Sequence, residues 1–479
     1  MNIEKSCSLI TALATTANVQ AQALDTQALD TQATLAGFRA EIAELRAHGI
    51  DGSSWLSQER ANEIRAIVSD VLADSSTRES LQETNATAGW KDGFFISSTD
   101  GNFTMNIRGY TQVRWTYDVR SSVSGLPASD EDDTWGFSVR RTKFMFEGTV
   151  IDPSWRYKVE VSAASGSNVL EDAWIEKVIT EGVNLKAGQF KTPFMREFLL
   201  PDSSTTMVDR SSIEAFFTPG RAQGVQLNWL AGDFQVTVAY LNAFEVKSNY
   251  YSSGSVRDIP WPSTKTSQYA FAGRLEWKPV GAWKDLRDLT GWRGEEFSAL
   301  FGVGGEIEKK DNNQGVPAMY GDLNSSVCAV TADATFEWSG ASIFTYGIWR
   351  VIDPNDAAYA TADQFGFVIQ GGVFVSDTVE LTARYEYGDA DSNPNDIAPV
   401  VGTTINANGY SIFSAATVGM NWYIAKQRVK IAADLGYAFD GVGAFANAGN
   451  GFLADGTSST GAFDENGQIL ARVQLQLIW

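Results

Sequence analysis

The alternation of apolar and polar residues predicts a chain built mainly from long β-strands. Between Phe103 and Asp118 the odd positions are mostly apolar or small, and the even positions are mostly polar or charged. The last eleven residues, Ile469–Trp479, show the same alternation from Ala471 onward. A period of two gives a strand one apolar and one polar face. The apolar face could form the core of a soluble sandwich or contact lipid around a barrel, and one strand alone does not decide between them.

The whole region after Phe94 keeps this period, and its connections alternate between short and long. We expect sixteen strands, at 103–118, 136–150, 154–163, 169–178, 182–192, 222–230, 233–242, 267–278, 296–308, 327–338, 341–350, 363–376, 379–388, 411–424, 428–438 and 467–479. Two connections break the alternation, a short one at 164–168 and a long one at 279–295. Bacterial outer-membrane barrels have an even number of strands, short periplasmic turns and long external loops.

Tryptophan supports the same orientation. Six tryptophans lie beside connections that this scheme places on the periplasmic side: Trp155, Trp229, Trp277, Trp338, Trp422 and Trp479. Aromatic belts at membrane interfaces explain such clustering, and a sandwich does not. The sequence therefore favours an all-β fold, a sixteen-stranded antiparallel transmembrane β-barrel over residues 94–479. A soluble β-sandwich is the alternative, and extraction into buffer without detergent would favour it.

The region before the barrel has helical rather than strand periodicity. Residues 1–23 resemble a secretory signal peptide that ends at a small-x-small site, Ala21-Gln22-Ala23. Residues 24–48 follow an a/d spacing, which predicts a coiled-coil arm in the periplasm. This arm could oligomerise or pack on its own barrel. An amphipathic helix is expected at 55–83, followed by a polar linker to Gly89.

Composition narrows the function classes. The net charge of −21 argues against a nucleic-acid partner. Cys7 and Cys328 form no CxxC motif, and we expect no metal site and no cofactor. The single histidine, His48, lies in the N-terminal arm, so a serine–histidine mechanism in the barrel is disfavoured and no enzymatic activity is expected.

The connection at 193–221 is the candidate constriction. A barrel of about sixteen strands is wide enough for water, so a segment that narrows it would control passage. This connection is unusually apolar for an external loop, which predicts either that it folds into the lumen or that it packs against a neighbouring subunit. The candidate constriction residues are Lys191, Arg196, Glu197, Asp209, Arg210 and Arg221.

Five segments resemble the phosphate-selective porin O and P family. They are Gly188–Glu197 (GQFKTPFMRE), Phe217–Val225 (FTPGRAQGV), Gln370–Val375 (QGGVFV), Val379–Tyr385 (VELTARY) and Val418–Tyr423 (VGMNWY). The resemblance covers residues 94–479. It implies a sixteen-stranded outer-membrane barrel, commonly a trimer, that passes small solutes. The N-terminal arm is not found in the best-known members, and phosphate selectivity does not transfer automatically.

A phosphate path would need converging cations with little acid nearby. The cations expected to face the lumen are Arg108, Arg114, Arg141, Lys143, Arg156, Lys158, Lys186, Lys191, Arg274, Arg350, Arg384, Lys430 and Arg472. Acids share these walls: Glu147, Glu160, Glu276, Asp333, Glu337, Glu380, Glu386 and Asp434. The two sets could instead pair across neighbouring strands and hold the wall together.

The favoured function is an outer-membrane porin for passive diffusion of small hydrophilic solutes or ions, with a preference for anions such as phosphate left open. The alternative is a structural barrel that tethers the envelope through its helical arm. The expected partners are outer-membrane lipid, small solutes or anions, two further copies in a homotrimer, and the barrel-assembly machinery. Leu475, Leu477 and Trp479 form the expected assembly signal.

Overall fold

The computed structural model describes residues 62, 66, 86–91, 93–119, 133–164, 167–244, 267–310, 326–353, 355, 361–391, 412–440, 442, 445, 451–452 and 467–479. The chain divides into two units, Met1–Thr84 and Asn85–Trp479. Within the first unit Asn62 and Ala66 are described, and both are helical. The expected signal peptide, the coiled-coil arm and the remainder of the helix at 55–83 lie outside the described residues.

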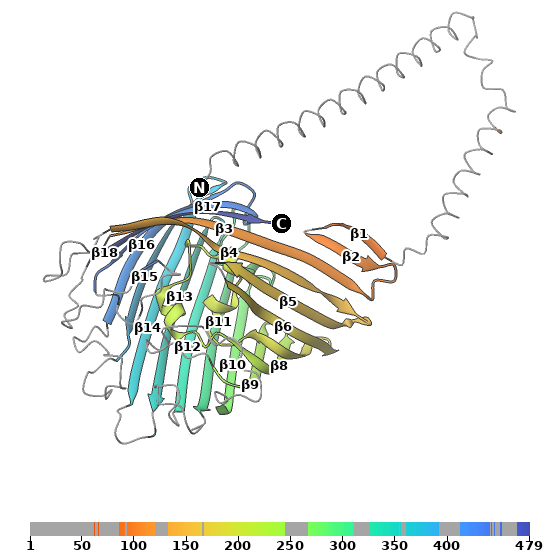
Figure 1. Ribbon diagram of the computed structural model, residues 1–479, viewed down its shortest axis with the longest axis horizontal. Helices are drawn as coiled ribbons and strands as arrows, with labels where there is room; N and C mark the ends of the chain where they lie inside the picture. Colours follow the sequence, from red (N-terminus) through yellow and green to blue (C-terminus); the bar gives the residue numbers. More distant parts are fainter. Residues whose placement is uncertain are drawn as a thin grey trace, which may run out of the picture. The chain divides into compact units, whose positions relative to one another are not determined.

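The second unit is a closed antiparallel β-barrel (Figure 1). Its strands are β3(Thr104–Val119), β4(Asp133–Val150), β5(Asp152–Ala164), β6(Ser167–Thr180), β7(Val183–Lys191), β8(Arg221–Ala231), β9(Phe234–Leu241), β10(Ser267–Val280), β11(Ser298–Lys310), β12(Ser326–Trp338), β13(Ala341–Asp353), β14(Ala362–Phe374), β15(Val379–Asp389), β16(Ile412–Tyr423), β17(Val429–Ala438) and β18(Gln468–Ile478). Each strand pairs with the next, and β18 pairs with β3 to close the barrel. The sixteen-stranded prediction is confirmed, with every expected strand present.

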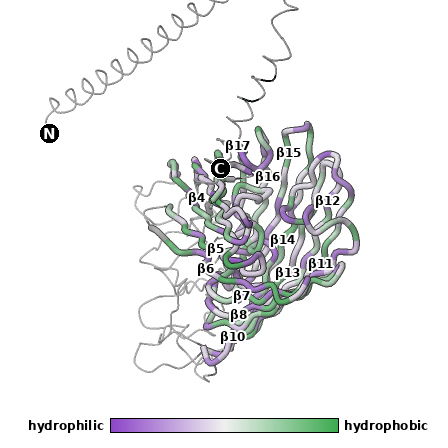
Figure 2. Tube along the Cα trace, turned by 90° about the vertical axis from the view of Figure 1, so that its right-hand side faces the viewer, coloured by the Kyte–Doolittle hydropathy of each residue, from purple (hydrophilic) through white to green (hydrophobic). Residues whose placement is uncertain are grey.

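The two faces of each strand differ as the alternation predicts. On β18, Leu475 and Leu477 are exposed on the outside, whereas Gln474 and Gln476 are buried on the inside. Figure 2 shows hydrophilic and hydrophobic residues alternating along the strands. Aromatic rings form an outer row near the short turns, where Trp277 stacks on Phe234 and Phe301 with ring centroids 6.3 and 5.6 Å away. Outward apolar residues with an aromatic row at the rim are typical of a lipid-facing barrel surface.

A hairpin precedes the barrel where the sequence predicted a polar linker. β1(Ala86–Trp90) pairs with β2(Phe94–Ser98), and β2 pairs with Thr104–Ile107 at the start of β3. The linker prediction to Gly89 was therefore wrong. β1 is five residues long and carries one large apolar side chain, Trp90, so its own sequence provides almost no alternation. The neighbouring edge of β3 supplies the pairing that local pattern does not.

Two β-bulges change which side chains face inward. On β4, Arg141 pairs with Gln112 but Val139 pairs with the next residue of β3, which leaves Arg140 as an extra residue. On β6 the pairing skips Glu171 in the same way. A bulge sets two residues against one and re-aims a side chain. Here each bulge brings two consecutive like-charged residues to the inner face.

Candidate functional site

The segment between β7 and β8, residues 192–220, folds into the lumen of the barrel, and we call it the inner loop. It contains α3(Arg196–Leu199), a 3-10 turn η1(Asp202–Ser204) and α4(Ser212–Phe217). Ser211 caps α4, because its hydroxyl accepts a hydrogen bond from the Glu214 amide at 2.9 Å. The apolar residues that made this connection unlike an external loop are almost fully buried: Phe194, Met195, Ile213 and Phe217.

One side of the inner loop packs on an apolar stretch of the barrel wall. This apolar wall is the group of inward-facing apolar residues on β13, β14 and β16, namely Phe344, Tyr346, Ile348, Val368 and Phe413. The ring of Phe216 lies 4.5 Å from that of Phe445. A Cβ at Gly366 would lie 2.6 Å from Ile213, so this glycine makes room for α4. Burying each phenylalanine contributes about 2–3 kcal/mol, so α4 is held mainly by the hydrophobic effect.

The other side of the inner loop is held by charge. The Asp209 carboxylate accepts hydrogen bonds from Arg114 at 2.7 Å, Arg140 at 2.9 Å and Arg141 at 2.8 Å. It is 1% exposed. Burial alone would raise the pKa of Asp209, but the surrounding arginines hold that pKa well below its usual range. Asp209 is therefore a fixed negative charge that ties the loop to β3 and β4.

A second anchor joins the loop to itself and to the wall. Asp202 forms ion pairs with Lys143 of β4 and with Arg210 of the loop. The Arg210 guanidinium also donates to the carbonyl oxygens of Glu197 at 3.0 Å and Leu200 at 2.8 Å. These bonds satisfy carbonyls of α3 and its end, which the short helix cannot pair internally.

The remaining constriction candidates also hold the loop in place. Lys191 donates to the carbonyl oxygens of Phe198 and Leu200 at 2.7 and 2.9 Å. Glu197 accepts from the amide and hydroxyl of Ser211. Arg221 pairs with Asp172 at 2.7 Å and with Glu171 at 2.8 Å.

Arg196 connects the inner loop to a second segment that enters the lumen from the short-turn end. This segment, residues 281–297 between β10 and β11, is named the inner linker and contains η2(Asp285–Arg287). Arg196 donates to the Leu286 carbonyl at 2.6 Å and lies 3.4 Å from Glu276. Thr206 donates to the Leu289 carbonyl at 3.3 Å. This linker is the long connection that broke the alternation of connection lengths, and its contacts with the inner loop account for that length.

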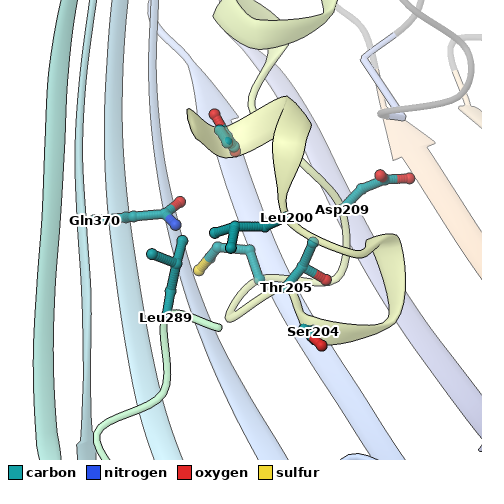
Figure 3. Close-up of a pocket in the computed structure, with 8 residues that line it drawn as sticks. Leu200, Ser204, Thr205, Asp209, Leu289 and Gln370 are labelled. Atoms are coloured by element: carbon teal, nitrogen blue, oxygen red, sulfur yellow. The ribbon is translucent and has the colours of Figure 1, made fainter. Parts of the chain in front are cut away.

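Figure 3 shows where the two segments meet. Leu200 of the inner loop, Leu289 of the inner linker and Gln370 of β14 point toward one another. The cavity among them has room for about one water molecule. A molecule larger than water therefore does not fit between these three side chains.

The expected lumen-facing cations fall into two groups. Arg114, Arg141, Lys143, Arg274 and Arg384 bond to the inner loop, and Arg472 pairs with Asp434 at 2.7 Å. Like Arg472, Arg108, Arg156 and Lys158 pair with acids of neighbouring strands, and these last three form the second group. The second group remains accessible to solvent, with 49% of the Arg156 side chain exposed and 42% of Arg108.

This accessible stretch is the inner face of β3–β7, and we call it the charged wall. Its partly exposed cations are Arg108, Arg140, Arg156, Lys158 and Lys186, and its partly exposed acid is Glu147. Arg140 also bonds to Asp209 of the inner loop, and Glu176 is 8% exposed. Arg156 and Lys186 share Glu176, at 3.5 and 3.7 Å. Cations outnumber acids on this surface, in contrast to the chain as a whole.

Sequence reasoning missed four residues of the site: Arg140, Glu171, Asp172 and Asp202. A strict period of two places Arg140 and Glu171 on the lipid face, where neither charge would be stable. The adjacent pairs Arg140-Arg141 and Glu171-Asp172 were therefore the available signal for a bulge. Asp202 carried no signal of its own, because its partners lie on distant strands.

Metal and helical membrane sites can be assessed over the same part of the chain. Among the residues that the structure describes, no group of three or more histidine, cysteine, aspartate or glutamate side chains is arranged to hold a metal ion. None of the described helices is long and apolar enough to cross a membrane.

Comparison with known proteins gives a family match. The family model "Phosphate-selective porin O and P" matches residues 110–437. No curated protein matches the chain. Similar solved structures include an anion-selective porin from Comamonas acidovorans (TM-score 0.49, 11% identity, covering 78% of this chain and 99% of that one). Others are OmpT of Vibrio cholerae in a trimer form (0.47, 14%, 78% and 99%) and the channel DcaP of Acinetobacter baumannii (0.46, 14%, 80% and 99%).

Proposed function

The chain belongs to the phosphate-selective porin O and P family, and from that premise we propose which ions its channel prefers and where they pass. The protein is an outer-membrane porin, a water-filled channel for the passive diffusion of small hydrophilic solutes. Family and fold indicate a channel rather than an enzyme. The location of His48, outside the barrel strands, supports the proposal that the barrel has no serine–histidine catalysis.

The permeation path runs along the charged wall and favours anions. The observation that carries this proposal is the excess of accessible cations over acids on β3–β7, next to an apolar wall that the inner loop covers. Accessible arginine and lysine side chains along a pore attract anions and repel cations. Phosphate and other small oxyanions are the class of solute that such a wall suits.

The six constriction candidates narrow the pore by holding the inner loop rather than by facing the solute. Five of them bond within the loop or fix it to the wall, and Arg221 pairs with acids of β6 at the point where the loop ends. Little of their side-chain surface is left exposed. The narrowest passage is then bounded by the inner loop and the inner linker on one side and by the charged wall on the other.

Planar-bilayer recording of the purified protein tests this function. We expect discrete channels and, across a potassium chloride gradient, a reversal potential of the sign for chloride preference. Absence of conductance would contradict the channel, whereas a reversal potential of the opposite sign would contradict the anion preference alone. Arg196→Glu is a poor probe of selectivity, because it would place a second carboxylate beside Glu276.

Assembly is proposed to follow the family pattern. The proposed state is a homotrimer, which cross-linking in native membranes would detect as a trimeric band. Leu475, Leu477 and Trp479 are proposed as the signal for the barrel-assembly machinery. Removal of Trp479 should lower membrane levels more than single-channel conductance, and normal levels of the shortened chain would contradict that role.

The N-terminal region is proposed to be exported and to lie in the periplasm. Its alternative role is a tether that attaches the membrane to the rest of the envelope. Deletion of residues 24–83 should leave conductance intact and change either trimer formation or envelope attachment. If both are unchanged, the arm has neither role.

A further inference from the structure

The hairpin β1–β2 extends the outer surface of the barrel past its seam. β18 pairs with β3 from Tyr110 to Val119, and β2 pairs with the same edge of β3 from Thr104 to Ile107. Between them, Trp479 and Gly109 exchange two backbone hydrogen bonds, of 2.9 and 3.1 Å. The seam strand and the hairpin therefore form one continuous sheet.

The outer face of this hairpin is apolar and exposed. Phe94 pairs with Ile107 and Ile96 with Met105, and directly paired residues point to the same side of a sheet. Trp90 pairs with Phe94 in turn. Trp90, Phe94 and Ile96 are 51%, 54% and 41% exposed. They therefore continue the face of β3 on which Val113 meets lipid. The opposite face carries Thr87 and Ser97, together with Phe95, whose ring lies over Gly89.

The depth of the hairpin in the membrane can be inferred relative to Trp479. Trp479 packs against Phe144 of β4, with ring centroids 6.0 Å apart, in the row of Gly109. Trp90, Phe94 and Ile107 form a row two residues further toward the short-turn end, about 7 Å along the strand at ~3.4 Å per residue. The polar headgroup layer begins at the aromatic belt and is roughly 5–7 Å thick on each side of a bilayer. This row therefore falls within the headgroup layer if Trp479 belongs to the belt.

We propose that the β1–β2 hairpin is an interfacial membrane anchor whose outer face, Trp90, Phe94 and Ile96, inserts among phospholipid headgroups of the periplasmic leaflet. The occupant is lipid because the face is continuous with the lipid-facing surface of the barrel. The edge-to-face pair of Trp90 and Phe94, with centroids 4.8 Å apart, gives it the aromatic character of an interface. Lys91, exposed in the hairpin turn, is placed to meet phosphate groups. This inference rests on the outer-membrane orientation proposed above.

Fluorophores attached to single cysteines test the proposal. In a background with Cys7→Ser and Cys328→Ser, the full chain is labelled at Ala88→Cys on the outer face of β1. Matched controls are Thr87→Cys on the inner face of β1 and Leu475→Cys on the lipid-facing side of β18. Each protein is reconstituted into phosphatidylethanolamine–phosphatidylglycerol vesicles, with or without bromine on the upper acyl carbons. Conductance of each variant is recorded in parallel.

The expected result is that brominated lipid quenches the label at residue 88 to an extent comparable with that at residue 475, and leaves the label at residue 87 unchanged. Quenching at residue 88 by aqueous iodide, with residue 475 still quenched by lipid, would overturn the anchor while the porin function stands. Protection of residue 88 from both reagents would assign the face to a protein partner and also overturn the proposal. No lipid quenching at residue 475 together with no conductance would instead overturn the membrane function itself.

Discussion

The charged wall and the apolar wall are built from strands with the same alternation but present different surfaces to the lumen. On β13 both faces are mainly apolar, with Phe344 and Ile348 inside and Ile343 and Trp349 outside, although Arg350 also faces inward. On β5 the inner face carries Arg156, Lys158 and Glu160. The inner loop explains the difference, because Phe344 and Ile348 are covered by apolar residues of the loop, whereas Arg156 stays in water. Where the loop covers a cation, as at Arg114, a carboxylate of the loop pairs with it.

The contrast shows that a side chain that faces the inside of the barrel does not necessarily line the pore. Arg384 and Arg156 both point into the barrel, but Arg384 donates to the Asp209 carbonyl of the inner loop and is 4% exposed. Arg156 keeps about half of its side chain in solvent. On our proposal, buried cations such as Arg384 hold the inner loop, whereas exposed cations such as Arg156 act on passing ions.

The largest effect is expected from Asp209→Asn, which removes the carboxylate that three arginines share. Leaving buried guanidinium groups without a partner typically costs ~3–5 kcal/mol, so we expect a loss near 5 kcal/mol in the free energy of unfolding. Urea unfolding in lipid vesicles measures it. Asp133→Asn, an exposed aspartate of β4, is the control and should change little. Equal losses in both variants would show that Asp209 is no special anchor.

A smaller loss is expected on the apolar wall from Phe217→Ala. Phe217 is fully buried against the wall, and truncation of a buried phenylalanine costs about 3–4 kcal/mol. The same unfolding measurement applies, and open-channel noise should rise because α4 is less firmly held. Phe137→Ala, at a position 76% exposed on the lipid face, should be nearly neutral. A neutral Phe217→Ala would mean that the apolar wall does not hold the loop.

A substitution on the charged wall should change the ion selectivity with little loss of stability, whereas a substitution beneath the inner loop should leave the selectivity unchanged. Arg156→Gln is expected to shift the reversal potential toward cations and to lower stability by less than ~1 kcal/mol, because its ion pair is exposed. Arg350→Gln changes a cation that is 2% exposed beneath α4 and should leave the reversal potential unchanged. A shift in the second variant and none in the first would reverse our assignment of the permeation path.

The last effect is the difference in pH response between the two inward segments. Burial raises the pKa of Asp288 in the inner linker to about 6, above its unfolded value, so the folded state binds this proton more tightly. Stability should therefore rise as pH falls through 6, and Asp288→Asn should remove that increment in urea unfolding. The pKa of Asp209 lies well below its usual range, so its anchor should persist unchanged over the same interval. A rise that survives in Asp288→Asn would contradict this origin.

The fold could be predicted from the sequence because lipid and water impose the period of two on every strand. The charged pairs could not be assigned, because whether Lys143 lines a pore or binds Asp202 depends on a loop that is distant in sequence. The bulges at Arg140 and Glu171 were not predicted, because a single extra residue interrupts the period of two without any local turn signal. The hairpin strands β1 and β2 were not predicted, because their pairing with each other and with β3, rather than their composition, determines that they are strands.

The shared edge of β3 has a mechanical consequence for closure. A slip of β18 by two residues along β3 would keep lipid-facing side chains outside and lumen-facing ones inside, so the alternation alone does not forbid it. In one direction, however, such a slip would drive Trp479 onto Ile107, a position that Phe94 of β2 already occupies. The hairpin thus blocks this slip of the last strand in one direction, and it limits in that direction the shear, and with it the diameter, of the closed barrel.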